Sequence, residues 1–281
     1  MNVPPCATGK PYRTIKPNAG WASLDWRELW RFRDLLLTLA GRDIKLRYRQ
    51  TALGALWVVL QPLLGAGIFS FVFGRVAKLP SDGIPYFVFA YVGLLGWNVF
   101  HGTFTKASSS LVQNAQMISK VFFPRIILPL STLFSTILDF AVAFALLPIL
   151  MLVTHTPLHW SILSLPLWLL LLTMLAVGAG LCAASLMVSY RDVQYVIPVL
   201  TGFLLYASPV GYAASSVPAT HQKVFFLNPL AGLLAGFRWS LLGTDMPPLI
   251  GLVVSVTAAV LALVAGAFAF ARLEGRFADV I

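Results

Sequence analysis

The sequence predicts an all-α integral membrane protein with six transmembrane helices. The mean hydropathy is +0.83 and 58% of the residues are hydrophobic, a composition that makes the lipid bilayer the main solvent of the chain. A helix needs about 20 residues to cross a hydrocarbon core of about 30 Å. Six apolar runs reach that length, at residues 51–74, 83–105, 126–153, 161–190, 193–212 and 246–271.

The distribution of positive charge predicts how these spans are oriented. Most of the 20 Lys and Arg residues fall in segments on the same side as the N-terminus, and half of them precede the first apolar run. Because cytoplasmic segments carry the excess of Lys and Arg, both termini are expected in the cytoplasm. The four cations left on the opposite side are Arg75, Lys78, Lys223 and Arg238.

The segment before the first span has two parts. Residues 1–22 are polar and rich in proline, which predicts a flexible cytoplasmic tail ahead of a single transmembrane domain at 23–281. Residues 24–50 are predicted to form a basic amphipathic helix. With a turn of about 100° per residue, Trp30, Leu37 and Ala40 fall on its apolar face. Such a helix lies along the membrane surface, either as an anchor or as a docking surface for a soluble partner.

Several classes of function are disfavoured by what the chain lacks. The net charge of +10 comes without an aromatic and basic recognition module, so membrane orientation explains it better than nucleic-acid binding does. Cys6, Cys182 and the four histidines show no metal-ligand spacing, and no metal site is assigned. Gly9-Lys10 is followed by proline rather than Ser or Thr, so no P-loop is present and no ATP hydrolysis is expected.

A series of motifs, in order along almost the whole chain, resembles type-2 ABC transporter permeases of the polysaccharide and O-antigen export family. The motifs are RDIKLRYRQTALGALWVVLQPLL (42–64), SKVFFPRIILPLS (119–131), SYRDVQYVIPVL (189–200), ASPVGY (207–212), NPLAGLLAGFRWSLLG (228–243) and RLEGRFADVI (272–281). The resemblance implies a permease subunit in the bacterial inner membrane that exports a lipid-linked polysaccharide of the O-antigen, capsule or teichoic acid type.

The same resemblance implies a homodimer that works with two copies of a cytoplasmic nucleotide-binding ATPase. That ATPase would bind ATP and Mg, so this chain would be a transport subunit without cofactor or catalytic residue. An exporter of a small drug or lipid is the alternative within transport. A membrane-embedded enzyme is a more remote one, because no catalytic cluster and no Gly-x-Ser-x-Gly elbow accompanies the acid in the third run.

Family likeness also assigns roles to segments at the cytoplasmic side. The chain before the first span would be an interface helix, and the segment after the second span would carry a cytoplasmic coupling helix that fits the ATPase. The residues implied in ATPase coupling are Arg42, Asp43, Lys45, Arg47, Arg49, Asn114, Gln116, Ser119, Lys120 and Arg125.

The translocation pathway needs walls that tolerate sugar, and aromatic rings stack on sugar C–H faces. Gln61-Pro62 adds a polar side chain and a freed carbonyl inside the first span, both costly in lipid unless paired or wet. Interfacial or packed aromatics are the ordinary alternative. The candidate pathway residues are Trp57, Gln61, Phe69, Phe73, Trp97, Phe203, Tyr206 and Tyr212.

Two further features lie in the connection between the fifth and sixth spans and within the third span. Residues between spans five and six are apolar but interrupted, and similar exporters place short re-entrant periplasmic gate helices there, with Asn228, Pro229, Arg238 and Trp239 as the gate candidates. A helix lying on the membrane surface is the alternative. Asp139, the acid in the third run, is interpreted as a hydrogen-bonded helix contact, with a functional role left open.

Overall fold

The computed structural model describes residues 30–49 and 54–274, and this part of the chain is helical without any strand. The predicted tail at 1–22, the start of the interface helix and the end of the RLEGRFADVI motif lie outside the described residues. The helices are α2 (Arg33–Arg49), α3 (Gly54–Phe69), η1 (Ser70–Val76), α4 (Tyr86–Gln113), α5 (Ala115–Lys120), α6 (Ile127–Phe144), α7 (Leu147–Val153), η2 (Trp160–Ser164), α8 (Leu165–Ser189), α9 (Val193–Ala207), η3 (Ala214–Ser216), α10 (Ala219–Phe225), α11 (Pro229–Leu242) and α12 (Leu249–Leu273).

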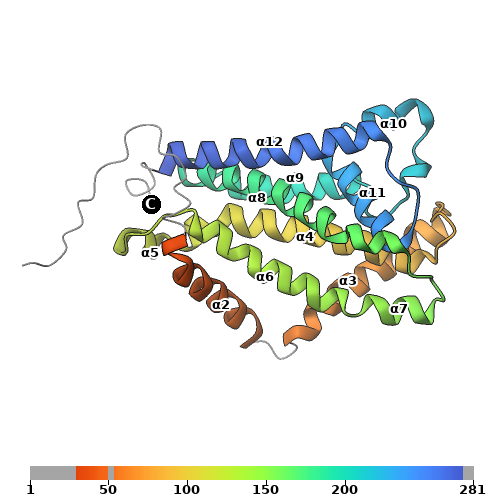
Figure 1. The fold of residues 1–281 in the computed structure, drawn as a ribbon, viewed down its shortest axis with the longest axis horizontal. Helices are drawn as coiled ribbons and strands as arrows, with labels where there is room; N and C mark the ends of the chain where they lie inside the picture. The colour runs from red at the N-terminus through yellow and green to blue at the C-terminus, as the bar shows by residue number, and fades with distance from the viewer. Residues whose placement is uncertain (1–29, 50–53, 275–281) are drawn as a thin grey trace, which may run out of the picture.

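The long helices run along the long axis of the molecule, and the short ones gather at its ends (Figure 1). α5 lies at the end where α12 finishes and α2 begins, and we call this the α5 end. α10 and α11 lie at the opposite end, which we call the α10 end. α11 is reached from α9 and left toward α12 at that same end.

Five helical stretches in the described residues are long and apolar enough to cross a bilayer. They are Leu56–Val76, Tyr86–Gln113, Ile127–Val153, Trp160–Ser189 and Leu249–Leu273. α9 is apolar but has only 15 residues. α10 and α11 would together reach the length of a span, but they are bent by 104° at a short break. A multi-pass helical membrane protein is therefore confirmed, with five spans by length and α9 shorter than expected.

Two helix ends differ from the sequence prediction, each for a local reason. The run expected at 193–212 stays helical only to Ala207, because Ser208 precedes a proline and adopts an extended conformation (φ −116°, ψ 152°). The second span continues to Gln113 rather than ending at 105. The serines that suggested a loop bond back to helix carbonyls instead, as Ser110 does to Ala107 at 2.7 Å.

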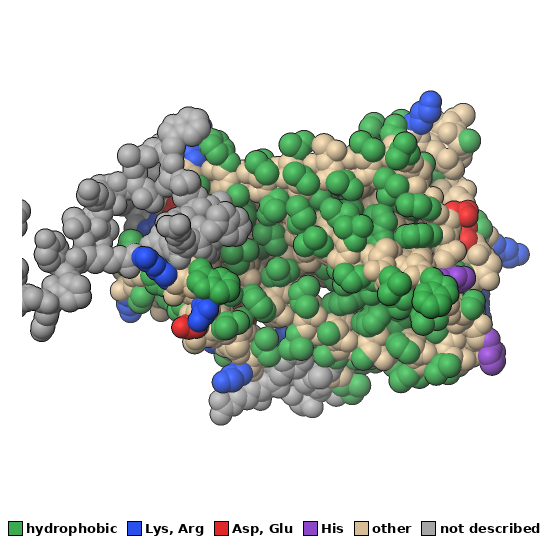
Figure 2. Space-filling view, in the orientation of Figure 1, with side chains coloured by type: hydrophobic (Ala, Val, Ile, Leu, Met, Phe, Trp, Pro, Cys, Tyr) green, Lys and Arg blue, Asp and Glu red, His purple; other side chains and the backbone are tan. Residues whose placement is uncertain are grey.

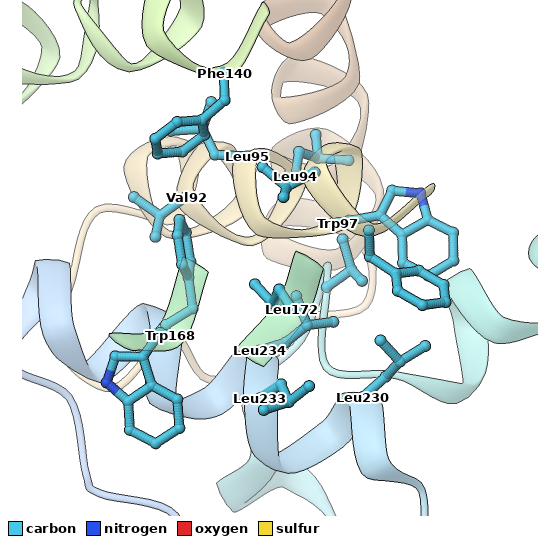
Figure 3. Close-up of a cluster of buried hydrophobic side chains, with 14 of the residues drawn as sticks. Val92, Leu94, Leu95, Trp97, Phe140, Trp168, Leu172, Leu230, Leu233 and Leu234 are labelled. Atoms are coloured by element: carbon cyan, nitrogen blue, oxygen red, sulfur yellow. The ribbon is translucent and has the colours of Figure 1, made fainter. Parts of the chain in front are cut away.

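α4 is the central helix of the fold. Side chains of α4, α6, α8 and α11 meet in one apolar cluster, in which Leu95, Leu172 and Leu233 are each 1% exposed or less. Figure 3 shows part of this cluster, with Trp97 of α4 and Trp168 of α8 at its two sides. α4 is consequently positioned by helices on several sides.

Apolar side chains also cover much of the outside. Val253, Leu261 and Phe268 of α12 are all more than half exposed, and Figure 2 shows hydrophobic side chains over the middle of the molecule with charged ones toward its ends. An exterior of this kind fits lipid rather than water as the surrounding solvent.

Candidate functional site

The candidate site lies where α2 meets α4, α5 and α6 at the α5 end. α2 buries Leu39 and Ala40, each 4% exposed, and Leu39 belongs to an apolar cluster that includes Leu111 and Ile118. The face of this helix that is buried differs by part of a turn from the predicted apolar face, since Leu37 is 56% exposed. By the spacing of an α-helix, positions 43 and 47 follow Leu39 and Ala40 on the same face. Asp43 there is partly buried and Arg47 is exposed, so this face becomes polar along the second half of α2.

A cluster of three charges joins α2 to two membrane helices. Oδ2 of Asp139 in α6 lies 2.7 Å from Nη1 of Arg47 in α2 and 3.1 Å from Nζ of Lys106 in α4. Lys106 also donates a hydrogen bond to Oγ of Ser135 at 2.9 Å. We call Arg47, Lys106 and Asp139 the Asp139 cluster. The acid in the apolar run is therefore ion-paired, with α2 and α4 both held to α6 through it.

A second polar contact joins α2 to the start of α5. Nη2 of Arg42 donates to Oδ1 of Asn114 at 2.9 Å and to Oδ1 of Asp43 at 2.9 Å. The amide of Asn114 donates in turn to the carbonyl of Ser110 at 2.8 Å, in the last turn of α4. Asn114 separates α4 from α5, so Arg42 contacts the residue at which the direction of the chain changes.

These two contacts border a polar cavity of about 450 Å³ between α2, α4 and α6. Its wall holds three cations, one acid and several hydroxyl and amide groups, including Arg42, Asp43, Arg47, Lys106, Asn114 and Ser135. Because Arg47 and Lys106 are paired with Asp139 and Arg42 with Asp43, the charges of the wall are largely compensated. A hydrated cavity of mixed polarity is the expected result.

The ten residues expected at the ATPase separate into three groups. Arg42, Asp43, Arg47 and Asn114 line the cavity. Lys45, Gln116, Ser119 and Lys120 are exposed and lie outside the wall of the cavity. Arg125 instead contacts the C-terminal end of α12: its backbone N–H donates to Oε1 of Glu274 at 3.0 Å, and its guanidinium donates to the carbonyl of that residue. The side chain of Arg49 lies outside the described residues.

Lys106 is the member of this site that sequence reasoning missed. The sequence prediction ends the second span at 105, which leaves Lys106 outside the membrane helices. The available signal was physical: an acid within an apolar helix needs a cation at the same depth, and Lys106 lies just beyond the predicted end of a neighbouring span.

The residues expected along the translocation pathway are placed in several environments. Trp57 of α3 and Phe203 and Tyr206 of α9 are 52%, 71% and 65% exposed, and Gln61 is exposed as well. Phe69 and Phe73 contact each other at 5.4 Å between ring centroids and pack near Gly211. Tyr212 is half-buried and donates to the carbonyl of Tyr206 at 3.1 Å.

Trp97 does not fit the expectation for a pathway residue. Its side chain is 5% exposed, and its ring packs against Phe100 and His101. α4 lies at the centre of the helix bundle, so this ring faces protein rather than an opening. In this structure Trp97 belongs to the packed interior of the bundle rather than to an exposed face.

The gate candidates lie at the α10 end, in and around α11. Oδ1 of Asn228 accepts from the backbone N–H of Leu230 at 3.0 Å, and its amide donates to Ser208 Oγ at 3.0 Å. Asn228 thus caps α11, with Pro229 as the first helical residue. Most of α11 is buried between other helices, with Trp239 half-buried against Trp168, so α11 packs inside the helix bundle.

Arg238 of α11 binds backbone rather than an acid. Its side chain is 3% exposed, and Nη2 donates to the carbonyls of Pro209 at 2.8 Å and Val210 at 2.9 Å. The guanidinium carbon lies 3.8 Å from the centroid of the Phe89 ring, a cation–π contact. Together with Tyr86, whose hydroxyl donates to Gly211 O at 2.6 Å, Arg238 satisfies the non-helical segment after α9.

Within the described residues, no group of three or more His, Cys, Asp or Glu side chains is arranged to hold a metal ion.

The chain is similar in sequence to several proteins that have been named. The O-antigen export system permease protein RfbA of Klebsiella pneumoniae is 30% identical over 88% of this chain and 95% of its own length. The protein of the same name from Myxococcus xanthus is 26% identical over 91% and 98%. The polysialic acid transport protein KpsM of Escherichia coli is 26% identical over 67% and 74%.

A family model supports the same grouping. The ABC-2 type transporter model matches residues 34–242, which run from the first turn of α2 to the end of α11. This chain therefore belongs to the ABC-2 type transporter family.

Proposed function

We propose that this chain is the permease subunit of an ATP-driven exporter that moves a lipid-linked polysaccharide across the bacterial inner membrane. The observation that carries the proposal is the likeness, over nearly the whole chain, to permeases named for O-antigen export. The exposed aromatic side chains of α3 and α9 support a route suited to sugar. The glycan would be of the O-antigen, capsule or teichoic acid type.

Energy for transport would come from a separate cytoplasmic ATPase, two copies of which bind a homodimer of this chain. The α5 end supports a docking role, since Gln116, Ser119 and Lys120 are exposed on α5. Phe122 follows this helix and is 64% exposed, and a large exposed apolar side chain beside polar ones is typical of protein interfaces. α5 is the proposed coupling helix and α2 the proposed interface helix.

The excess of Lys and Arg in α2, in α5 and at the end of α12 supports a cytoplasmic position for the α5 end. The α10 end would then face the periplasm. α9 would be the fifth span, completed by the buried segment after it, and α10 with α11 would form a re-entrant gate. Their 104° bend and the burial of α11 support this assignment.

The pathway would lie between two copies of the chain. Residues of α3 and α9 that are exposed in one chain, Trp57, Gln61, Phe203 and Tyr206, would face it from both protomers. An exposed glutamine in an apolar helix is costly against lipid and favourable against a wet cavity.

Co-expression with candidate ATPase subunits tests the proposal. We expect one ATPase to copurify with this chain, and we expect lipid-linked glycan to stimulate its ATP hydrolysis in proteoliposomes and to be moved across the bilayer. A matched Walker A lysine substitution in the ATPase supplies the inactive control. Failure of every ATPase to copurify would contradict the proposal, and stimulation by small lipids or drugs without glycan would favour the alternative exporter class.

A further inference from the structure

Asp139 joins α2 to the membrane helices through an ionic contact. One carboxylate oxygen accepts from Arg47 of α2 at 2.7 Å and from Lys106 of α4 at 3.1 Å. The three side chains are 15%, 39% and 27% exposed for Asp139, Arg47 and Lys106. Because the three side chains are partly buried, their electrostatic attraction is stronger than that of a surface ion pair. Because they also remain partly exposed, the ion pairs can break and form again.

The two halves of α2 are held in different ways. The first half is fixed by apolar packing of Leu39 and Ala40. The second half, with Arg42 and Arg47, borders the polar cavity of about 450 Å³. Close-packed side chains resist displacement, whereas a hydrated cavity leaves room for it. The position of the second half of α2 therefore depends on its polar contacts rather than on packing.

We propose that Asp139 is a positioning residue that couples movement of α2 to α4 and α6. Through one carboxylate, a displacement of α2 at the docked ATPase is passed to both helices at once. α4 packs against α3 and α11, so the movement reaches the proposed pathway and the proposed gate. The inference rests on the proposed function and adds a route by which force enters the membrane domain.

Removing the carboxylate has a definite physical consequence. Asp139→Asn removes the carboxylate that Arg47 and Lys106 share and leaves Asp43 as the remaining acid of the cavity wall. Arg47 and Lys106 then repel each other more strongly, so the end of α2 that carries Arg47 moves away from the spans. The apolar half of α2 and the bond from Arg42 to Asn114 remain. The variant should therefore still bind the ATPase while transmitting its movement poorly.

The experiment measures glycan exported per ATP hydrolysed, using the full-length permease with its ATPase in proteoliposomes. We expect this ratio to fall about tenfold or more in Asp139→Asn, on the scale of coupling within one charge network. A purely structural role would lower the amount of assembled complex and would leave the ratio unchanged. Asp34→Asn is the matched control, because it removes an exposed α2 carboxylate 3.7 Å from Arg33, and it should keep the wild-type ratio.

Two further variants make the test independent of folding. Arg47→Gln breaks the cluster at its most exposed member, and Asp139→Glu keeps the charge and should retain most of the wild-type ratio. In the double variant Arg47→Gln with Asp139→Asn, the loss should be no greater than in Asp139→Asn alone. Losses that multiply, or an unchanged ratio in Asp139→Asn and Arg47→Gln, would overturn the coupling role.

The two proposals fail in different ways. If the wild-type complex does not assemble or does not export glycan, the proposed function is wrong. If the wild-type complex exports glycan and Asp139→Asn exports equally well per ATP, the function stands and the coupling role of Asp139 is wrong.

Discussion

Arg238 illustrates how a single residue supports irregular backbone inside a membrane protein. The guanidinium presents several N–H donors in a fixed plane, and the carbonyls of Pro209, Val210 and Tyr212 accept from it at 2.8, 2.9 and 3.4 Å. Gly93 of α4 permits this approach, since a Cβ there would overlap the carbonyl oxygen of Val210 and Nη2 of Arg238. The segment after α9 is thereby fixed between α4 and α11.

Replacing Arg238 with methionine should lower stability strongly. The substitution leaves buried carbonyls without a donor, at a cost of about 1–3 kcal/mol for each group that finds no replacement. The measurement is thermal unfolding of the purified permease in detergent. Arg75→Met, which changes an exposed arginine of η1, is the control and should leave the unfolding temperature nearly unchanged. Equal unfolding temperatures for both variants would show that Arg238 does not hold this segment.

At the scale of helices, small residues decide which pairs approach closely. Gly178 of α8 lies against the backbone of Ala262 in α12, and a Cβ on Gly266 would overlap the carbonyl of Gly178. Close backbone contact through small residues is a common basis of helix association in membranes. The α8–α12 pair is therefore set by glycine on both sides of the crossing.

Adding one methyl group at this crossing should separate the two helices. Gly178→Ala meets backbone atoms that cannot rotate away, so we expect a loss of about 1–3 kcal/mol in stability. Gly202→Ala is the matched control, because nothing lies within 4 Å of the added Cβ in α9. Alanine lowers the backbone freedom of the unfolded chain, so this substitution should be neutral or slightly stabilising. Thermal unfolding of both variants compares them directly. A stable Gly178→Ala protein would mean that the helices adjust without cost.

Helix identity was predictable from sequence, whereas helix ends and pairings were less so. Apolar length identified the spans, but serines that bond to their own helix concealed the last turns of α4, and a proline ended α9 early. The acid Asp139 was recognised from its apolar surroundings. Its partners Arg47 and Lys106 come from helices distant in sequence, and a single sequence does not show which helices pack together.

At the scale of the whole molecule, the exposure of the side chain separates pathway candidates from residues of the packed core. Gln61 and Phe203 are exposed on α3 and α9. Trp97, an aromatic of the same kind, is buried at the centre. The sequence does not separate the two aromatic positions, Phe203 and Trp97, because lipid, a wet pathway and a packed core all accept aromatic rings.

Cysteine labelling during transport distinguishes these environments. In a chain without Cys6 and Cys182, we expect Gln61→Cys and Phe203→Cys to react with a membrane-impermeant maleimide while the complex hydrolyses ATP with glycan present. Ala90→Cys, at a position with 0% exposure in α4, should stay unreactive. Reaction would be followed by mass spectrometry. If Gln61→Cys and Phe203→Cys remain as unreactive as Ala90→Cys, the pathway does not pass α3 and α9.

The carbonyls after α9 also impose an order on biosynthesis. Their donor Arg238 lies 29 residues farther along the chain than Pro209, so the ribosome must complete α11 before this backbone is satisfied. Lipid offers no hydrogen bonds in the meantime. α9 is therefore expected to wait beside the insertion machinery, or in water, until α11 arrives, and the two helices are expected to enter the bilayer as one unit.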